Sequence, residues 1–200
     1  MTSVSSKTPN LQFQPLTPDR WRDFETLFGP SGAYGGCWCM WWRLTRTEFN
    51  RRSADERKSG MKSVVDSGEV PGIVAYVDGQ PAGWCSVAPR ERFGSLERSR
   101  ILKRLDERPV WSVVCFFVGR PFRGRGVMGG LLQAAVDYAR QQGADVVEGY
   151  PVEGKDKLPG GTKAYVGIAS AFREAGFVEV GRPAPDRRVM RYYIGGTPKE

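Results

Sequence analysis

The alternation of apolar and polar side chains predicts that the chain begins with a strand and a helix. The stretch 11–16 (LQFQPL) alternates like a half-buried strand. Thr17 and Pro18 follow as a cap and a first helical residue. This order predicts a helix through Trp21, Phe24, Leu27 and Phe28.

Alternating patterns typical of strands and 3.6-residue patterns typical of helices continue along the rest of the chain. Residues 71–91 predict a hairpin, because Asp78 and Gly79 separate two runs rich in β-branched and aromatic residues. The almost continuously apolar stretch 110–118 is typical of a central strand that is covered on both faces. Helices are expected at 54–66, 95–106, 127–141 and 166–175, further strands at 144–150, 177–182 and 188–194, and a loop at 151–164.

Length and composition favour one folded domain. With 200 residues, the chain is long enough for one buried core and too short for two ordinary domains. We expect a polar tail at 1–10 and a single domain at 11–200. No apolar run approaches the roughly 20 residues that span a bilayer, and the first residues lack the apolar core of a signal peptide. No membrane association and a cytoplasmic location are therefore expected.

The cysteines and the net charge narrow the chemistry only partly. Cys37, Cys39, Cys85 and Cys115 are expected to be free thiols, since the cytosol keeps thiols reduced. They lack the paired Cys-x-x-Cys spacing of a zinc site, and the chain has no histidine, so no metal is expected. The net charge of +8 favours an anionic partner such as nucleic acid, an acidic protein or a phosphate-bearing cofactor. Solvated surface charge is the alternative.

The densest aromatic cluster of the chain is CWCMWW at 37–42, which follows the glycine-rich loop 29–36. Its tryptophans need burial or a ligand. Packing in the core or in a homodimer interface is one interpretation, and a wall of the substrate pocket is the other.

A short segment between the strand 110–118 and the helix 127–141 carries the clearest chemistry. It reads GRPFRGRG and contains three arginines. A helix N-terminus exposes unpaired N–H groups and the positive end of its dipole, which together bind phosphate. Gly124 and Gly126 allow the backbone to approach a phosphate closely. The spacing matches neither a nucleoside-triphosphatase loop nor a dinucleotide fingerprint.

In its spacing of Val118, Arg123, Gly124 and Gly126, followed by an apolar helix, the segment resembles the pyrophosphate loop of the GNAT acetyltransferases. The string FREAGFVEV at 172–180 and the order of the predicted elements are similar to that family as well. The resemblance covers roughly residues 11–195. It implies an α/β (α+β) GNAT fold, with a central mixed, mostly antiparallel sheet of about seven strands flanked by helices.

The resemblance also implies an activity and a set of contacts. The chain would transfer an acetyl group from acetyl-CoA, as co-substrate, to a primary amine of a small molecule or peptide, by direct attack in a ternary complex. The backbone of Phe116, Phe117 and Val118 would bond the pantetheine arm like an added strand. The pyrophosphate would bind the amides of Arg123, Gly124, Arg125, Gly126, Val127, Met128 and Gly129.

The chain departs from the family pattern at three positions. Met128 stands where a small residue is usual, which would narrow the phosphate seat. Phe172 occupies the place of the family's frequent acid tyrosine, and a phenyl ring cannot donate a proton. Tyr165 replaces an asparagine that often begins the late helix.

Glu148, Tyr150 and Tyr165 are therefore the candidates for proton transfer. Glu148 and Tyr150 share one face of a strand, with Tyr165 and Cys115 behind them. Glu148 is the preferred base, directly or through water, and an ion pair with an arginine is its alternative role. Core packing is the alternative for Tyr150, and a small buried apolar group is the favoured role for Cys115.

Two other functions remain open at this point. A fold-preserving, catalytically silent sensor that binds acyl-CoA is compatible with the missing tyrosine. A basic nucleic-acid-binding protein is compatible with the net charge and with clusters such as RSRILKR at 98–104. The absence of a nucleic-acid fold signature disfavours the second.

Overall fold

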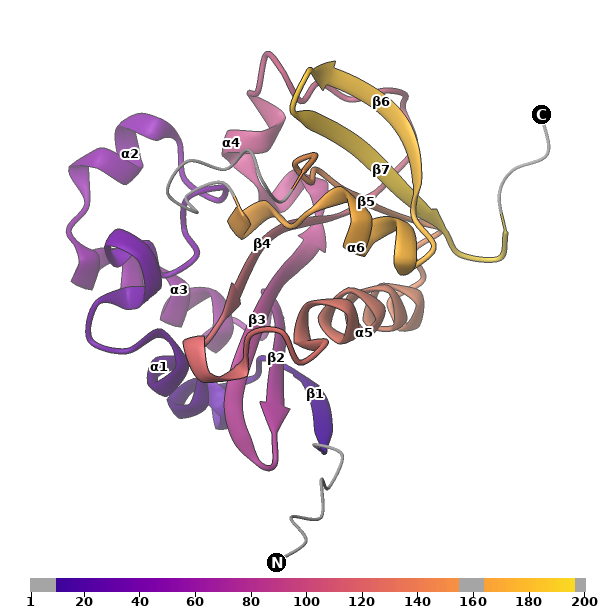
Figure 1. The fold of residues 1–200 in the computed structure, drawn as a ribbon. Helices are drawn as coiled ribbons and strands as arrows, with labels where there is room; N and C mark the ends of the chain where they lie inside the picture. The colour runs from indigo at the N-terminus through magenta and orange to yellow at the C-terminus, as the bar shows by residue number, and fades with distance from the viewer. Residues whose placement is uncertain (1–9, 155–163, 197–200) are drawn as a thin grey trace, which may run out of the picture.

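The computed structural model describes residues 10–154 and 164–196, arranged around one seven-stranded sheet (Figure 1). The strand order is β1-β2-β3-β4-β5-β7-β6. The strands are β1 (Leu11–Pro15), β2 (Gly72–Val77), β3 (Gln80–Pro89), β4 (Trp111–Val118), β5 (Val146–Gly149), β6 (Val178–Ala184) and β7 (Arg187–Tyr193). Among the described strands, β4 and β5 are the only pair that runs in parallel. The expected mixed, mostly antiparallel sheet is confirmed.

Helices cover both faces of this sheet (Figure 1). The helices are α1 (Trp21–Phe28), α2 (Arg46–Arg51), α3 (Ala54–Asp66), α4 (Gly94–Glu97), α5 (Val127–Gln141) and α6 (Ala169–Glu174). Short helical turns are η1 (Pro18–Arg20), η2 (Gly32–Gly36), η3 (Arg90–Arg92), η4 (Arg120–Phe122) and η6 (Ala164–Val166). None of the helices in the described part of the chain is long and apolar enough to cross a bilayer.

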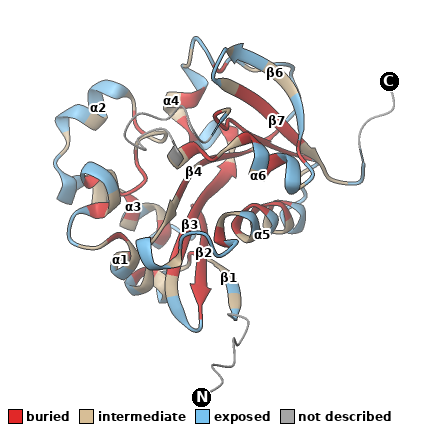
Figure 2. Ribbon diagram, in the orientation of Figure 1, coloured by how far each residue is buried: buried red, intermediate tan, exposed pale blue. Residues whose placement is uncertain are grey.

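Strand β2 shows how the alternation of side chains makes two cores. Ile73 and Ala75 point to the face covered by α5 and α6. Val74 and Tyr76 point to the face covered by α1 and α3. Because both faces are covered, all of β2 is buried, and Figure 2 shows buried residues through the middle of the sheet.

The helix expected at 95–106 is wrong beyond its first turn. Helix α4 ends at Glu97, and the chain continues as a loop. The carbonyl oxygen of Leu102 accepts a hydrogen bond from Arg90 Nη2 at 2.6 Å, and its N–H donates to Ser99 Oγ at 2.9 Å. The side chains of Arg90 and Ser99 thus take the place of the backbone partners that a helix would supply. In the resulting loop, Ile101 is 61% exposed and does not belong to a buried stripe.

Two smaller expectations also need correction. The helix expected after Pro18 begins as the turn η1, and Thr17 makes no capping bond to the backbone. Its hydroxyl donates to Asp19, and its oxygen accepts from Arg20 Nη1 at 2.7 Å. Strand β5 is shorter than the expected 144–150. Most of the expected tail 1–10 and most of the loop 151–164 lie outside the described residues.

Candidate active site

Strand β4 leaves its neighbour β5 part of the way along its length. The parallel register joins residues 111–113 to residues 147–149. From Val114 to Val118, β4 pairs only with β3 among the described strands. The turn η6 lies beside this other edge of β4. A strand edge of this kind offers backbone N–H and C=O groups to an extended ligand.

A β-bulge marks the point where the two strands diverge. In the register between β3 and β4, Val113 and Cys115 oppose consecutive residues of β3, so Val114 is an extra residue. Val113 and Phe116 consequently both face the core under α5, whereas Val114 and Cys115 face the opposite side. The bulge therefore directs the Cys115 side chain to the face of the gap opposite α5.

The glycines of the loop before α5 are required by backbone conformation. Gly124 has φ +74° and Gly126 has φ +76°, in the left-handed region that side chains other than glycine rarely adopt. A Cβ atom at either position would meet nothing within 4 Å. The outer side of this loop is therefore open to a ligand.

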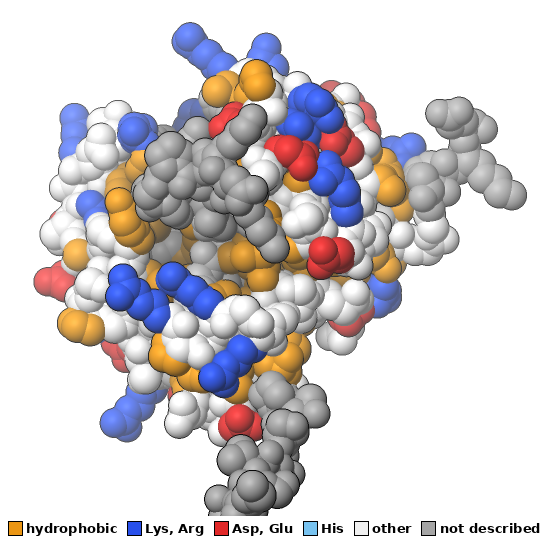
Figure 3. Space-filling view, in the orientation of Figure 1, with side chains coloured by type: hydrophobic (Ala, Val, Ile, Leu, Met, Phe, Trp, Pro, Cys, Tyr) orange, Lys and Arg blue, Asp and Glu red, His pale blue; other side chains and the backbone are white. Residues whose placement is uncertain are grey.

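The N-terminus of α5 is uncapped and lies among basic residues. No side chain caps the helix, and no acidic residue lies in its first turn. The nearby side chains of Arg120, Arg123 and Arg125 are exposed. Lys and Arg side chains gather where β4 leads into α5 (Figure 3). Free N–H groups, the helix dipole and these arginines together favour an anion, which fits the expected pyrophosphate.

Met128 and Phe172, two positions at which the chain departs from the family pattern, both pack against the core. Met128 packs against the core cluster beneath α5. Phe172 is completely buried, and its ring meets that of Phe116 edge to face at a centroid distance of 6.1 Å. Phe172 therefore serves as a core residue in this chain.

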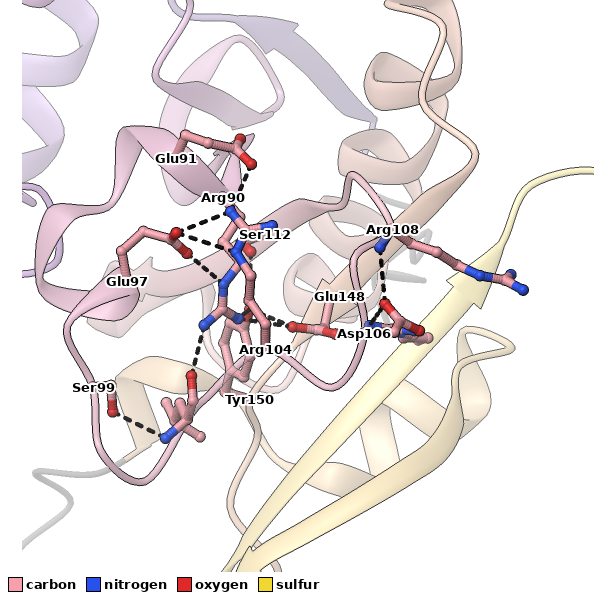
Figure 4. A network of polar contacts seen from close by, with 12 residues as sticks. Arg90, Glu91, Glu97, Ser99, Arg104, Asp106, Arg108, Ser112, Glu148 and Tyr150 are labelled. Carbon is pink, nitrogen blue, oxygen red and sulfur yellow. Dashed lines mark hydrogen bonds and ion pairs between the residues drawn. The ribbon is translucent and has the colours of Figure 1, made fainter.

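Glu148 lies in a buried network of charged side chains (Figure 4). Its Oε1 accepts hydrogen bonds from Arg90 Nη1 at 3.0 Å and from the Tyr150 hydroxyl at 2.7 Å, and its Oε2 accepts from Arg191 Nε at 2.7 Å. Both oxygens are thus already occupied. This geometry favours the alternative role as an arginine partner, and the role of Glu148 as a base stays a prediction.

The network ties the long loop after β3 to the other half of the sheet. Arg191 on β7 donates to both oxygens of Asp106, at 2.6 and 3.0 Å. This contact is the main cause that lowers the pKa of Asp106. Arg90 also donates to Glu97 at 2.7 Å. The loop is therefore held beneath the gap by buried charges.

Tyr150 joins the same network from the end of β5. Its hydroxyl lies 2.9 Å from the Ser112 hydroxyl and accepts from Arg90 Nη1 at 2.7 Å. Burial, followed by the charge of Glu148, raises its pKa well above the ordinary value. The phenol therefore stays protonated at neutral pH.

Tyr165 lies on η6, the turn beside the edge of β4 that is unpaired among the described strands. Burial is the main cause that raises its pKa, followed by Cys115, while Arg187 and Arg46 act to lower it. Its hydroxyl has no hydrogen-bond partner among the described residues. Of the three predicted proton-transfer residues, Tyr165 is therefore the one whose hydroxyl is not already bound within the charged network.

The segment CWCMWW supplies mainly core. Trp38 is buried, and its ring stacks on that of Phe28 at 5.6 Å. Trp42 is half-buried and packs against the cluster that contains Val114 and Tyr150. Its Nε1 atom is buried without a hydrogen-bond partner. The core interpretation is correct for Trp38, and Trp42 borders the gap.

The four cysteines are free thiols, as expected, and they gather near Cys39. A hydrogen bond from Cys115 is the main cause that lowers the pKa of Cys39, and the Trp84 Nε1 atom also donates to its sulfur at 3.1 Å. Burial is the main cause that raises the pKa of Cys37 to about 11. The described residues contain no cluster of ligands that could hold a metal ion.

Sequence reasoning missed the arginines of this region. Arg90 is one of the largest fully buried side chains, and Arg187 and Arg46 approach Tyr165 from two different elements. No local pattern distinguishes these three from the exposed arginines of the chain. Their roles depend on contacts between segments far apart in sequence.

Comparisons with known proteins agree with this geometry. Residues 37–150 match the acetyltransferase (GNAT) family. No curated protein matches the chain in sequence. Among solved structures, an aminoglycoside N-acetyltransferase in complex with CoA is 16% identical with a TM-score of 0.54, and 90% of this chain aligns with 95% of that chain.

Two further solved structures are similar over nearly their whole length. A ribosomal-protein-S5-alanine acetyltransferase from Vibrio fischeri is 13% identical with a TM-score of 0.55, and 96% of this chain aligns with 97% of that chain. A ribosomal-protein-alanine N-acetyltransferase from Brucella melitensis is 16% identical with a TM-score of 0.52, and 92% of this chain aligns with 99% of that chain. At these identities the likeness shows a common fold.

Proposed function

Because the chain belongs to the GNAT family of acetyltransferases, we propose that it transfers an acetyl group from acetyl-CoA to a primary amine by direct attack in a ternary complex. One combination of features carries the proposal. The edge of β4 from Val114 to Val118 is unpaired among the described strands, and it leads directly into the uncapped N-terminus of α5. An extended arm that ends in phosphates matches both parts of this surface.

Proteins of the GNAT family use acetyl-CoA, and the residues of this chain fit it. Phe116, Phe117 and Val118 would bond the pantetheine arm through their backbone. The amides from Arg123 to Gly129 would bind the pyrophosphate. Gly124 and Gly126 have no side chain and border open space, which leaves room for it. When bound, acetyl-CoA supplies an activated acetyl thioester.

The transfer needs the removal of one proton and the addition of another. The ammonium of the acceptor must lose a proton before its nitrogen bonds the acetyl carbon, and the departing thiolate must gain one as the C–S bond breaks. Tyr165 is our candidate for the acid, since its hydroxyl is protonated at neutral pH and its turn η6 lies beside β4. Positioning of the two reactants supplies most of the acceleration.

Glu148 and Tyr150 have a supporting part in this proposal. Glu148 bonds two guanidinium groups and the Tyr150 hydroxyl, so it holds β5, β7 and the loop after β3 together below the gap. A direct role as base would require one of these bonds to open. We propose that Glu148 acts as a positioning residue and that water carries the proton of the ammonium to solvent.

The continuous sheet supports a further proposal, that residues 11–200 form a single acetyltransferase domain. All seven strands belong to one sheet, and the match to the family spans both sides of the gap. We also propose that the acceptor is a small molecule or a peptide.

Two measurements test the proposed activity. Saturating acetyl-CoA should raise the melting temperature, because it binds the folded state alone. Release of free CoA thiol should then depend on the presence of an amine. A melting temperature that does not respond to acetyl-CoA would contradict the proposal. Binding without thiol release for any amine in a broad panel would favour a silent sensor.

A further inference from the structure

Arg187 brings a guanidinium group to the acceptor side of the gap. It is the first residue of β7, and its Nη1 donates to the carbonyl oxygen of Tyr150 at 2.9 Å, directly after the end of β5. Its side chain is half-buried, and burial is the main cause that lowers its pKa, while Tyr165 and Asp186 oppose this effect. It takes part in no ion pair between the residues that the structure describes. Its guanidinium makes no other hydrogen bond to a described residue, so donors remain for a ligand.

A second guanidinium group approaches from a different element. Arg46 is the first residue of α2, and it lies over the ring of Trp41 at 4.2 Å from the centroid. Like Arg187, it acts to lower the pKa of Tyr165. Arg46 is exposed and also forms no ion pair within the described ranges. Among the described residues, neither arginine has a carboxylate partner.

The acidic side chains that the structure describes on the surrounding elements are already engaged. Glu148 binds Arg90 and Arg191. Glu48 caps the helix α2, and Glu69 pairs with Arg43 at 2.7 Å. Glu153 pairs with Arg173 and Arg188, and Asp186 also has a partner. A polycationic acceptor would therefore find none of these carboxylates free.

Trp42 adds a hydrogen-bond donor on the same side. Its indole Nε1 is buried without an acceptor, next to the cluster of Val114 and Tyr150. A buried donor that lacks a partner costs free energy, and natural proteins usually satisfy such groups. A ligand oxygen at this position would supply the missing acceptor.

We propose that the acceptor is a small amine that also carries a carboxylate, and that Arg187 and Arg46 bind this carboxylate while the amine is acetylated. Guanidinium groups bond carboxylates through two parallel N–H donors, which fixes orientation as well as charge. The inference rests on the acetyltransferase activity proposed above. It specifies which amines that activity uses.

Binding of matched amine pairs tests the proposal directly. The free L-amino acids and their carboxamides would be titrated by calorimetry into protein saturated with CoA. Each pair has the same side chain and differs in the carboxylate. We expect at least one amino acid to bind at least ~10-fold more tightly than its amide, because a charge-assisted pair is lost in the amide. Equal affinity across all pairs, or no binding of any acid, would overturn the proposal.

Variants identify the residues responsible. Arg187→Gln should abolish the preference for the acid while the affinity for CoA itself stays unchanged, and Arg187→Lys should retain part of it. Arg46→Gln should weaken the same preference. Arg51→Gln, an exposed arginine at the other end of α2, is the matched control and should have no effect. Full preference in both Arg187→Gln and Arg46→Gln would also overturn the proposal.

The failure of this proposal differs from the failure of the proposed activity. A protein that binds CoA and acetylates amines but prefers amides or polyamines would retain the activity and refute the carboxylate site. A protein that binds amino acids over their amides but releases no thiol from acetyl-CoA would retain the site and refute the transfer.

Discussion

Glu148 Oε2 accepts a hydrogen bond from Arg191 Nε at 2.7 Å, and both side chains are almost completely buried. The pair joins the two strands β5 and β7 directly below the place where β4 diverges. Arg90 binds the other oxygen of the same carboxylate. The two buried cations thus share one buried carboxylate, and each also pairs with a second one, Arg90 with Glu97 and Arg191 with Asp106.

The first prediction concerns the stability of this pair. Glu148→Gln removes the carboxylate that the two buried guanidinium groups share and leaves Arg90 with Glu97 and Arg191 with Asp106. We therefore expect a loss of about 3 kcal/mol in the free energy of unfolding, measured with urea, at the lower end of the cost of breaking a buried ion pair. Asp137→Asn is the control, because the ion pair of Asp137 with Arg140 is exposed and should contribute less than about 1 kcal/mol. If Glu148→Gln left stability intact and lowered kcat by about 100-fold or more, Glu148 would instead be the base.

The second prediction tests the phosphate site at the start of α5. Gly126→Asp introduces a negative charge where we expect the pyrophosphate, and it should weaken acetyl-CoA binding by more than about 10-fold, since ~1.4 kcal/mol suffices for that factor. Gly143→Asp is a close control, because Gly143 follows α5, has φ +80° and also meets open space. Equal affinity in the two variants, measured by calorimetry, would refute the site.

The third prediction concerns the missing tyrosine. Phe172→Tyr should not raise turnover, because the added hydroxyl would lie in a fully buried site among Phe116 and Gly149. An unpaired buried hydroxyl costs about 1–3 kcal/mol, which should lower the melting temperature. A clear gain in kcat in this variant would mean that position 172 can reach the reacting groups after all.

The fourth prediction tests Tyr165 as the acid. Tyr165→Phe should lower kcat by roughly 100-fold at unchanged acetyl-CoA affinity, since a general acid typically contributes this much. Tyr138→Phe is the control, because Tyr138 lies on α5 against Trp111.

Tyr165 also has a consequence for the pH dependence of the reaction. Its raised pKa keeps the phenol protonated below its folded pKa, so the acid remains available until the pH exceeds the ordinary tyrosine value of about 10. The profile of kcat should therefore show no fall between neutral pH and that value. A fall below pH 9 that disappears in Tyr165→Phe would show that the phenol ionises earlier than its burial implies.

Local patterns were sufficient to predict most of the elements and the phosphate loop. The apolar residues of α5 repeat every 3.6 positions, and the hairpin of β2 and β3 carries its Asp78-Gly79 turn in the sequence itself. Gly124 and Gly126 are recognisable because only glycine adopts their backbone conformation without strain. These features depend on neighbours within a few residues, so the sequence by itself determined them.

The fates of the charged side chains were decided by tertiary structure. Glu148 lies 58 residues from Arg90 and 43 from Arg191, and the register of β5 with β7 brings them together. The same long-range contacts make a loop of the segment after α4, where Arg90 binds the Leu102 carbonyl in place of a helix partner. Burial and ion pairing depend on which distant segments meet, and no local periodicity records that. This is why the glycine conformations before α5 were predictable from the sequence and the partners of Glu148 and Arg90 were not.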